Sequence, residues 1–163
     1  MHTHRVQLAV NGKLKTVTVP ADERLLDTLR TKMDLYGARY GCGTGHCGAC
    51  VVSQEGVGLV PSCLMLTVRL DGAAITTYEG LETDPLMRDL QDAFVEEGAA
   101  QCGYCTPGIL LSLHHVLSQD PVDENVVRES LVSHLCRCTG HYASVRAAMK
   151  VLQRKAGMKV AVD

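Results

Sequence analysis

The sequence predicts an α+β protein with a mixed N-terminal part and an all-helical C-terminal part. Three observations lead to this prediction. Residues 1–79 contain short segments in which apolar and polar side chains alternate, as they do in strands. Residues 80–163 contain four segments in which apolar side chains recur at helical spacing. Between the strand-like segments lies a loop rich in glycine and cysteine, at residues 37–50.

The first predicted elements are a hairpin and a helix. Apolar residues alternate over 5–10 and over 15–19, and the Asn-Gly dipeptide at 11–12 is a strong turn signal. A helix is expected over 23–35, with Asp22 as its N-cap. The helix prediction rests on apolar residues at helical spacing, namely Leu25, Leu26, Leu29 and Met33.

Three more strands are expected to complete a small sheet. They lie at 49–53, near 63–68 and at 73–77. Two strands, a helix and further strands around a glycine-rich loop are typical of a small α+β domain. The helical pattern begins after residues 78–83, so the sequence predicts one domain over 1–79 and a second over 80–163.

Four helices are expected in the C-terminal part. Asp-Pro at 84–85 and Thr-Pro at 106–107 each place a capping residue before a proline, which is typical of a helix start. Asp123 precedes the third helical segment, and the fourth covers 142–155. Apolar residues at helical spacing are Leu86, Leu90, Phe94, Ile109, Leu110, Leu113, Leu117, Val126, Val127, Leu131, Val145, Met149 and Leu152. Short helices with brief connections indicate a helical bundle.

The bulk composition excludes several classes of protein. Apolar residues make up 46% of the chain, which is enough for a packed core. The net charge is −2 and the basic residues are scattered, so no nucleic-acid partner is expected. No segment approaches the roughly 18 apolar residues of a membrane-spanning helix. Residues 1–10 carry no targeting signal, so we expect a cytoplasmic protein without a membrane anchor.

Cysteine is the unusual feature of the composition, with 8 residues among 163. In a reducing cytosol, such a count indicates metal binding rather than disulfides. The cysteines fall into two groups, as sets of metal ligands do. No acid/base pair or activated nucleophile accompanies them, so no catalytic residue is expected in this chain.

The first group consists of Cys42, Cys47, Cys50 and Cys63, and its first three members are spaced C-x4-C-x2-C. This spacing matches the plant-type [2Fe–2S] ligand pattern. Four thiolates close such a site, which favours electron transfer over substrate binding. Glycines among the ligands let the backbone approach a compact cluster and donate N–H groups to its sulfurs. Zinc, disulfides and buried thiols are the alternatives.

The second group pairs Cys102 and Cys105 with Cys136 and Cys138. This is not a ferredoxin spacing, and zinc is a serious alternative because paired cysteines are typical of its sites. Cys105 and Cys138 each precede a predicted helix start, where backbone N–H groups favour anions. That arrangement supports a metal without identifying it, and it predicts a local pseudo-two-fold around one site.

Three motifs carry a family resemblance. Gly-Cys-Gly-Thr-Gly-His-Cys-Gly-Ala-Cys at 41–50, Gln-Cys-Gly-Tyr-Cys-Thr-Pro-Gly at 101–108 and Leu-Cys-Arg-Cys-Thr-Gly at 135–140 resemble the iron–sulfur subunit of the xanthine oxidase family of molybdenum hydroxylases. The resemblance spans roughly residues 5–152, and the order and spacing of the motifs are highly specific.

The resemblance implies an N-terminal β-grasp ferredoxin domain followed by a four-helix bundle, with one [2Fe–2S] cluster in each. The implied ligands are Cys42, Cys47, Cys50 and Cys63 for the first cluster, and Cys102, Cys105, Cys136 and Cys138 for the second. It further implies that Gln101 and Cys138 approach the pterin of a molybdenum cofactor, which a large partner subunit binds. A medium FAD-binding subunit usually takes the electrons, in a heterotrimer or a dimer of heterotrimers.

Some residues depart from the family pattern or allow two interpretations. Ser133-His134 and His141 stand where the family often has Gly-Asn and Tyr, and these changes flank the second group of ligands without removing any of them. Arg137 either offsets cluster charge or pairs with a surface acid. His46 is expected to be a solvent-facing or sulfur-adjacent residue and not a ligand, because four cysteines already fill the first site.

The resulting hypothesis is an electron-transfer subunit that relays electrons one at a time from molybdenum through two clusters to FAD or another acceptor. A free-standing ferredoxin is one alternative, and a zinc-stabilised interaction module is another. The substrate cannot be inferred, because its pocket is expected to lie in another chain.

Overall fold

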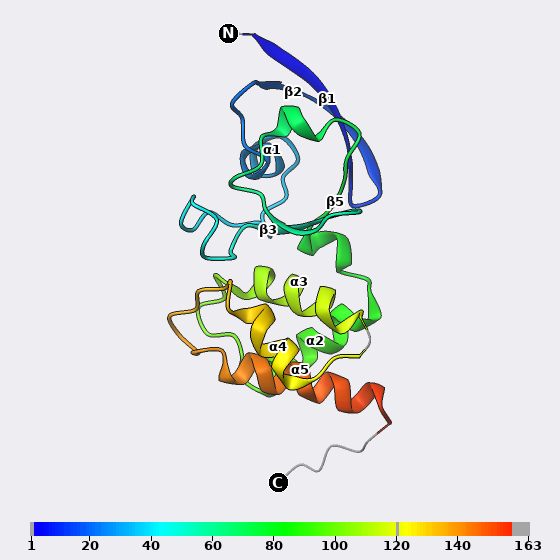
Figure 1. Ribbon diagram of the computed structural model, residues 1–163, viewed down its shortest axis with the longest axis vertical. Coiled ribbons are helices and arrows are strands. Elements are labelled where there is room, and N and C mark those ends of the chain that lie inside the picture. The colour runs from blue at the N-terminus through cyan, green and yellow to red at the C-terminus, as the bar shows by residue number, and fades with distance from the viewer. Residues whose placement is uncertain (1, 120, 158–163) are drawn as a thin grey trace.

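In the computed structural model, the strands and the main helices separate into two lobes stacked along the long axis of the molecule (Figure 1). The structure describes residues 2–119 and 121–157. The N-terminal lobe holds the sheet and α1 (Leu25–Lys32), and the helical lobe holds α2 to α5. The predicted α+β class is therefore confirmed. The predicted division at 79/80 falls within the 3-10 helix η2 (Tyr78–Leu81) and stays a prediction, and its outer limits lie outside the described residues.

The sheet of the N-terminal lobe has the strand order β2-β1-β5-β3-β4. Its strands are β1 (Thr3–Val10), β2 (Lys13–Pro20), β3 (Val51–Gln54), β4 (Gly58–Pro61) and β5 (Ala74–Thr76). β1 pairs antiparallel with β2 and parallel with β5, whereas β3 runs antiparallel to both β4 and β5. The parallel β1–β5 pair requires the crossover that carries α1 and the cysteine loop across the sheet.

The predicted hairpin is confirmed, and its turn explains its sequence. Asn11 and Gly12 both have positive φ, 52° and 73°, as a two-residue turn of the I′ type requires. Alternation in β1 places Val6, Leu8 and Val10 in the core. Leucines of α1 cover the same core, and each fully buried leucine contributes about 2 kcal/mol. These leucines are Leu25, Leu26 and Leu29, all at 0% exposure.

Three predictions for the N-terminal lobe are wrong in detail. α1 begins after Arg24 rather than Asp22 and ends at Lys32. The strand predicted near 63–68 does not form. That segment instead bonds the start of α1, through Leu25 N to Met65 O at 2.8 Å, and then enters the 3-10 helix η1 (Thr67–Leu70). Its backbone partners therefore lie outside the sheet, and the unpredicted strand β4 pairs with β3 instead.

The helical lobe contains the four predicted helices. They are α2 (Pro85–Glu96), α3 (Thr106–Leu117), α4 (Glu124–Leu131) and α5 (Tyr142–Lys155). Asp84 caps α2 by accepting a hydrogen bond from Met87 N at 3.0 Å, and Asp123 caps α4 in the same way. None of the described helices is long and apolar enough to cross a bilayer.

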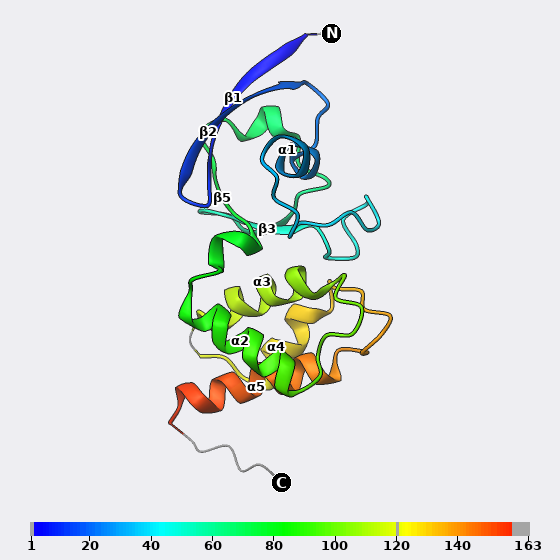
Figure 2. The ribbon, with the colours of Figure 1, turned by 180° about the vertical axis from the view of Figure 1, so that it is seen from behind.

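The two lobes meet at α3, which among the α-helices of the helical lobe lies nearest the sheet in both ribbon views (Figures 1 and 2). Its partner in the N-terminal lobe is β3. The approach is close, because a Cβ added at Gly108 of α3 would lie 2.4 Å from the carbonyl oxygen of Gly48. A hydrogen bond from Leu135 N to Cys47 O, 3.1 Å long, crosses the same junction. The cysteine-bearing loops of the two lobes are therefore adjacent.

Candidate metal centres

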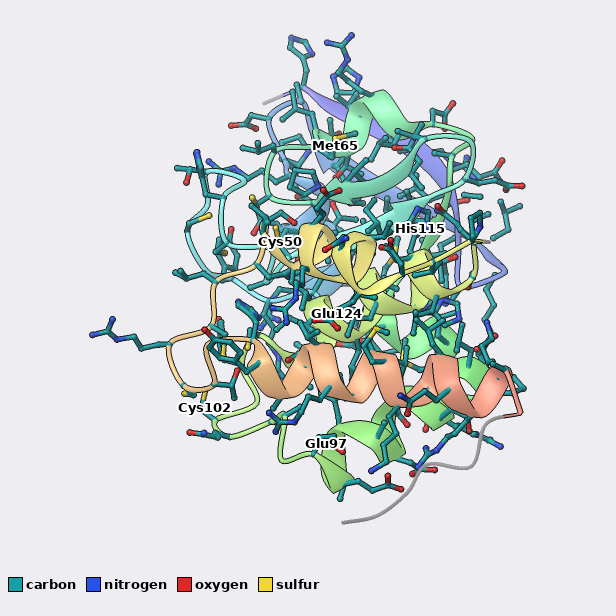
Figure 3. The ribbon with its side chains drawn as sticks, turned by 60° about the horizontal axis from the view of Figure 1, so that its bottom comes forward. Cys50, Met65, Glu97, Cys102, His115 and Glu124 are labelled. Carbon is teal, nitrogen blue, oxygen red and sulfur yellow. The ribbon has the colours of Figure 1, made fainter. Side chains whose placement is uncertain are left out.

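The two cysteine groups lie at one end of the lobe junction, around a cavity of about 420 Å³. The cavity is lined by Gly41, Cys42, Cys47, Ala49, Cys102, Tyr104, Cys105, Leu135, Cys136, Arg137 and Cys138. Figure 3 shows Cys102 at the edge of the helical lobe and Cys50 nearer the middle of the molecule. Cys50 and Cys63 are 3% and 2% exposed, so they lie behind the cavity in the N-terminal lobe.

The loop 41–50, here called the N-terminal cysteine loop, aims backbone N–H groups at sulfur. The N–H groups of Thr44 and His46 donate to Cys42 Sγ at 3.4 and 3.3 Å, and Cys42 N donates to Cys47 Sγ at 3.3 Å. The Thr44 hydroxyl and these N–H groups lower the pKa of Cys42 to about 5. The loop is thus built to stabilise an anionic sulfur.

Glycine is required where this loop closes on its own sulfur. A Cβ added at Gly41 would lie 2.5 Å from Cys47 Sγ, which is well inside van der Waals contact. Gly43, Gly45 and Gly48 have φ of 69°, 81° and 69°, a region that residues with a side chain rarely adopt. The glycines of the motif therefore have steric reasons that are independent of any resemblance.

The buried half of the first group has the opposite electrostatic character. Burial raises the pKa of Cys50 to about 11, and the thiol interacts with that of Cys63. A buried thiol of this kind is deprotonated only when a cation replaces its proton. Metal binding is the ordinary way to supply that charge.

The second group is assembled from two separate segments, 101–105 and 135–140, here called the helical-lobe cysteine segments. Cys105 is the N-cap of α3. Burial raises the pKa of Cys105 to about 12, and its thiol hydrogen-bonds with that of Cys136. Burial also acts to raise the pKa of Cys136, but the hydroxyl and N–H groups of Thr139 outweigh it and bring that pKa to about 7. Cys102 interacts with Cys138 in the same way, and hydrogen bonds from Tyr104 N and Cys138 lower its pKa.

The predicted two-fold relation between Cys105 and Cys138 is wrong. α3 begins directly after Cys105, but α5 begins only at Tyr142, after the left-handed residue His141 with φ 67°. The segment between Cys138 and α5 instead turns back, so that Thr139 N and Thr139 Oγ1 contact Cys136 Sγ at 3.4 and 3.0 Å. One site is therefore served by a helix start and a turn rather than by two equivalent helices.

The thiols are arranged in pairs rather than as converging quartets. Thiol contacts thiol in Cys50 with Cys63, Cys102 with Cys138, and Cys105 with Cys136, whereas Cys42 is joined to Cys47 Sγ through its main-chain N–H. Each iron of a [2Fe–2S] cluster takes two thiolates, whereas a structural zinc ion takes four ligands at about 2.3 Å. Within residues 2–119 and 121–157, no three potential ligands converge on one ion. All eight cysteines are free thiols. The paired arrangement fits two-iron clusters better than zinc or disulfides.

The other residues singled out by the sequence lie around these sites. Gln101, Arg137 and Cys138 are all exposed, and Cys102, next to Gln101 in the chain, contacts Cys138. The described residues offer Arg137 no ion pair, so the interpretation of Arg137 as the partner of a surface acid is not supported. His46 is exposed, and its ring nitrogen lies 3.2 Å from Thr44 Oγ1.

Two features of the junction were missed by sequence reasoning. His134 is buried there, with Nε2 2.8 Å from Ser112 Oγ and with its ring against Gly48. Burial and the neighbouring His141 lower the pKa of His134 to about 4, so this ring is neutral at pH 7. Arg39, two residues before the N-terminal cysteine loop, reaches across to Gly103. The sequence places both residues near cysteines, but nothing in it indicates that they cross between lobes.

Comparison with known protein families agrees with this geometry. Residues 8–68 match the family described as a 2Fe-2S iron-sulfur cluster binding domain, and residues 77–150 match the [2Fe-2S] binding domain family. The chain is 39% identical over 152 residues to the nicotinate dehydrogenase small FeS subunit of Eubacterium barkeri, covering 92% of this chain and 95% of that protein. It is 42% identical over 146 residues to the nicotine 6-hydroxylase small subunit of Paenarthrobacter nicotinovorans, covering 88% and 87%.

Solved structures show the same fold. A chain of quinoline 2-oxidoreductase from Pseudomonas putida 86 superposes with a TM-score of 0.85 at 34% identity, covering 96% of this chain and 99% of that chain. The aldehyde oxidoreductase from Desulfovibrio gigas gives a TM-score of 0.84 at 36% identity, where this chain corresponds to 18% of the longer chain. The chain therefore carries two [2Fe–2S]-binding domains and belongs to the iron–sulfur, electron-transfer subunits of the xanthine oxidase family of molybdenum hydroxylases.

Proposed function

We propose that this chain relays single electrons from the molybdenum cofactor of a large partner subunit, through its helical lobe and then its N-terminal lobe, to FAD in a medium subunit. The observation that carries the proposal is the cavity at the lobe junction, which thiols from both cysteine groups line. A relay needs two redox sites close together inside one rigid scaffold, and the packing of α3 on β3 supplies the scaffold.

The paired thiols support a specific assignment of ligands. In the N-terminal lobe, Cys42 and Cys47 would hold one iron while Cys50 and Cys63 hold the other. In the helical lobe, Cys102 and Cys138 would hold one iron, and Cys105 and Cys136 the other. When bound, each [2Fe–2S] cluster accepts and gives up one electron.

The chain's own groups prepare these sites for negative charge. The N–H groups of Thr44 and His46 in the first site and of Thr139 in the second donate to cysteine sulfur, which stabilises thiolate and favours the reduced state. Burial of Cys50 and Cys63 keeps water from that half of the first site. These residues hold and tune the clusters, and substrate turnover belongs to the partner.

A continuous route through the protein joins the two sites. Leu135, the residue before Cys136, donates its N–H to the carbonyl oxygen of Cys47 at 3.1 Å. A ligand of one site is thus one hydrogen bond and one peptide unit away from a ligand of the other. This supports direct transfer between the two lobes without a further carrier.

We propose that the molybdenum subunit docks over the exposed outer edge of the helical lobe. Gln101, Cys102 and Cys138 are exposed there, which suits Gln101 and Cys138 to approach the pterin of the cofactor. Leu135 is 73% exposed beside them, as a side chain awaiting a partner surface would be. The eight free thiols fit a cytoplasmic assembly, and a heterotrimer or a dimer of heterotrimers would hold all three redox groups.

The test is to purify the native complex anaerobically and to record its metal content, its subunits and its electron paramagnetic resonance after dithionite reduction. We expect molybdenum, FAD, about four irons per copy of this chain, and two distinct one-electron centres. Zinc in place of iron would refute the cluster assignment. A chain that carries both centres but elutes alone in gel filtration would instead support the free-standing ferredoxin.

A further inference from the structure

Arg39 contacts the cysteine segments of both lobes. Its backbone N–H donates to Ala49 O at 2.8 Å, and Ala49 lies between Cys47 and Cys50. Its guanidinium Nη1 donates to Gly103 O, and Gly103 lies between Cys102 and Cys105. One residue is therefore anchored to the first ligand loop by its main chain and to the second by its side chain.

Tyr104, in the helical lobe, makes two further contacts with residues 39 and 40 of the N-terminal lobe. The guanidinium of Arg39 lies over the Tyr104 ring, 5.5 Å from its centroid, and the Tyr104 hydroxyl donates to Tyr40 O. Residues 39–40 and 103–104 thus hold one another by two hydrogen bonds and a stacked pair. We call this set the Arg39–Tyr104 clamp.

The charge of Arg39 is not used by a carboxylate. No ion pair joins Arg39 to an acid in the part of the chain that the structure describes. Its side chain is half-buried, so solvent screens it only in part. The guanidinium is therefore held by the Gly103 carbonyl oxygen and the Tyr104 ring alone, both in the cysteine segment of the helical lobe.

The clamp is also the part of the junction that substitution can remove without disturbing a cysteine. The Leu135–Cys47 bond is formed by main-chain groups that no substitution removes, short of proline. His134 packs directly against Gly48 inside the N-terminal cysteine loop, so its replacement would disturb the ligands themselves. Arg39 lies outside both cysteine segments. Tyr104 lies between Cys102 and Cys105 and bonds Cys102 through its main-chain N–H, which Tyr104→Leu retains, so only the side chain that reaches Tyr40 is lost.

We propose that Arg39 is a positioning residue for transfer between the two clusters: with Tyr104 it holds the two ligand loops at a fixed separation. The inference rests on the proposed relay function. The step it serves is the movement of one electron, in which the cluster of the helical lobe is oxidised by one electron and that of the N-terminal lobe is reduced by one. The rate of such a step falls steeply with the distance between the two clusters, so a larger or variable separation of the ligand loops slows it.

Three variants separate position from charge. Arg39→Gln removes the charge, the planar donor fork and the stack. Arg39→Lys keeps the charge but loses the fork and most of the stacking, because an ammonium group is a compact point charge. Tyr104→Leu leaves Arg39 in place and removes only the ring and the hydroxyl.

Arg24→Gln is the matched control. Arg24 also lies beside the N-terminal cysteine loop, since a Cβ added at Gly43 would be 3.6 Å from Arg24 Nη1. Its side chain makes no hydrogen bond or ion pair to the helical lobe among the described residues. The Arg24→Gln substitution therefore removes one positive charge near the first site and leaves the Arg39–Tyr104 clamp unchanged.

The experiment uses the purified complex and needs no substrate. Iron content and the two resonance signals first show that both clusters are present. The magnetic interaction between the two dithionite-reduced centres then reports their separation. Pulse radiolysis, which delivers single electrons, measures how fast the two centres equilibrate. Redox titration reports the potential of each centre.

We expect Arg39→Gln, Arg39→Lys and Tyr104→Leu to weaken the magnetic interaction and to slow equilibration severalfold, because both the interaction and the transfer rate fall as the two centres move apart. Arg24→Gln should leave both readouts at wild-type values while shifting the potential of the first centre. A variant of Arg39 that fails to take up a cluster leaves Tyr104→Leu to decide the question.

The proposal would be overturned if Arg39→Lys and Tyr104→Leu both kept the wild-type magnetic interaction and the wild-type equilibration rate. If Arg39→Gln alone then lost them, the charge of Arg39 and not its position would explain the effect. Failure of the proposed relay function would look different from failure of the Arg39 proposal. In that case the wild-type and Arg24→Gln complexes would themselves lack two iron centres.

Discussion

The two cysteine sites differ in how they are built. Three ligands of the first site come from one loop of ten residues, 41–50, whose shape is set by its own glycines and N–H···S hydrogen bonds. The second site joins segments that lie far apart in the chain, and each segment depends on a helix that packs elsewhere. The first site has two buried cysteines, Cys50 and Cys63, beside the exposed Cys42, whereas the second site has none that is buried.

This difference indicates that the first site is formed largely by local structure, whereas the second site depends on tertiary packing. A loop that closes on its own sulfur needs little from the rest of the fold. A site assembled from the N-terminus of α3 and the turn before α5 exists only while those helices are packed. Its exposed edge is where we propose that the molybdenum subunit docks.

The largest effect is expected from Cys50→Ser, which should remove the cluster of the N-terminal lobe and leave that of the helical lobe. Reduction of the external acceptor should fall to near background, while the molybdenum site is still reduced by substrate. Resonance spectra of the reduced complex and steady-state acceptor reduction measure the two effects. Acceptor reduction at full rate in this variant would show that electrons leave by another route.

The next largest effect is expected from Leu113→Ala in the core of the helical lobe, where Leu113 is 0% exposed. The cavity should cost about 2–5 kcal/mol of unfolding free energy. On warming, the signal of the helical-lobe centre should disappear before that of the first centre. Urea unfolding and variable-temperature spectra measure both.

Val95→Ala is the control for this variant, because Val95 lies on α2 and is 82% exposed. Its effect should stay within about 0.5 kcal/mol. Simultaneous loss of the two centres in Leu113→Ala would contradict the distinction between a local and a tertiary site, since it would show that the lobes unfold as one unit.

Gly48→Ala tests the point where the two sites meet. Gly48 has φ 69°, and an added Cβ would lie 2.2 Å from His134 Nδ1. Backbone strain and the collision should together cost about 2–4 kcal/mol, measured by urea unfolding. Gly56→Ala has a similar φ of 74° and open space around it, so it should cost only about 1–2 kcal/mol. An equal loss of unfolding free energy in the two variants would mean that His134 moves away from residue 48 at no measurable cost.

The smallest effect concerns the α2–α5 contact, where Glu97 bonds Lys150 Nζ at 2.9 Å and Arg146 Nε at 3.0 Å. These bonds lower the pKa of Glu97 below its usual value of 4.5. The stabilisation is therefore present above that value and is lost as the pH falls through the lower folded-state pKa. Glu97 and Lys150 are 20% and 18% exposed and Arg146 is 60% exposed, so solvent still reaches and screens these ion pairs, and we expect under about 1 kcal/mol.

Glu97→Gln should flatten the fall in the urea midpoint that accompanies acidification from about pH 7 to about pH 4. Glu129→Gln is the control, because Glu129 is exposed and makes no ion pair among the described residues. If the two variants respond to acid identically, the ion pairs of Glu97 contribute nothing measurable.

Local signals in the sequence predicted much of the fold, and the failures have a common cause. The hairpin at Asn11-Gly12 and the helix starts at Asp84 and Asp123 depend on neighbouring residues, and all three are confirmed. The strand expected near 63–68 was wrong because that segment hydrogen-bonds residues at the start of α1 instead of a strand of the sheet. The short β4 carried too little alternation to be recognised.

By itself the sequence determined the fold class, the two cysteine groups and the family, because ligand spacing and glycine placement are properties of short stretches of chain. Only the tertiary structure decided which thiols pair, that Cys138 precedes a turn instead of a helix, and that Arg39, His134 and Leu135 join the two lobes. Such contacts depend on the packing of α3 against β3, and packing between distant segments leaves no periodic trace in a single sequence.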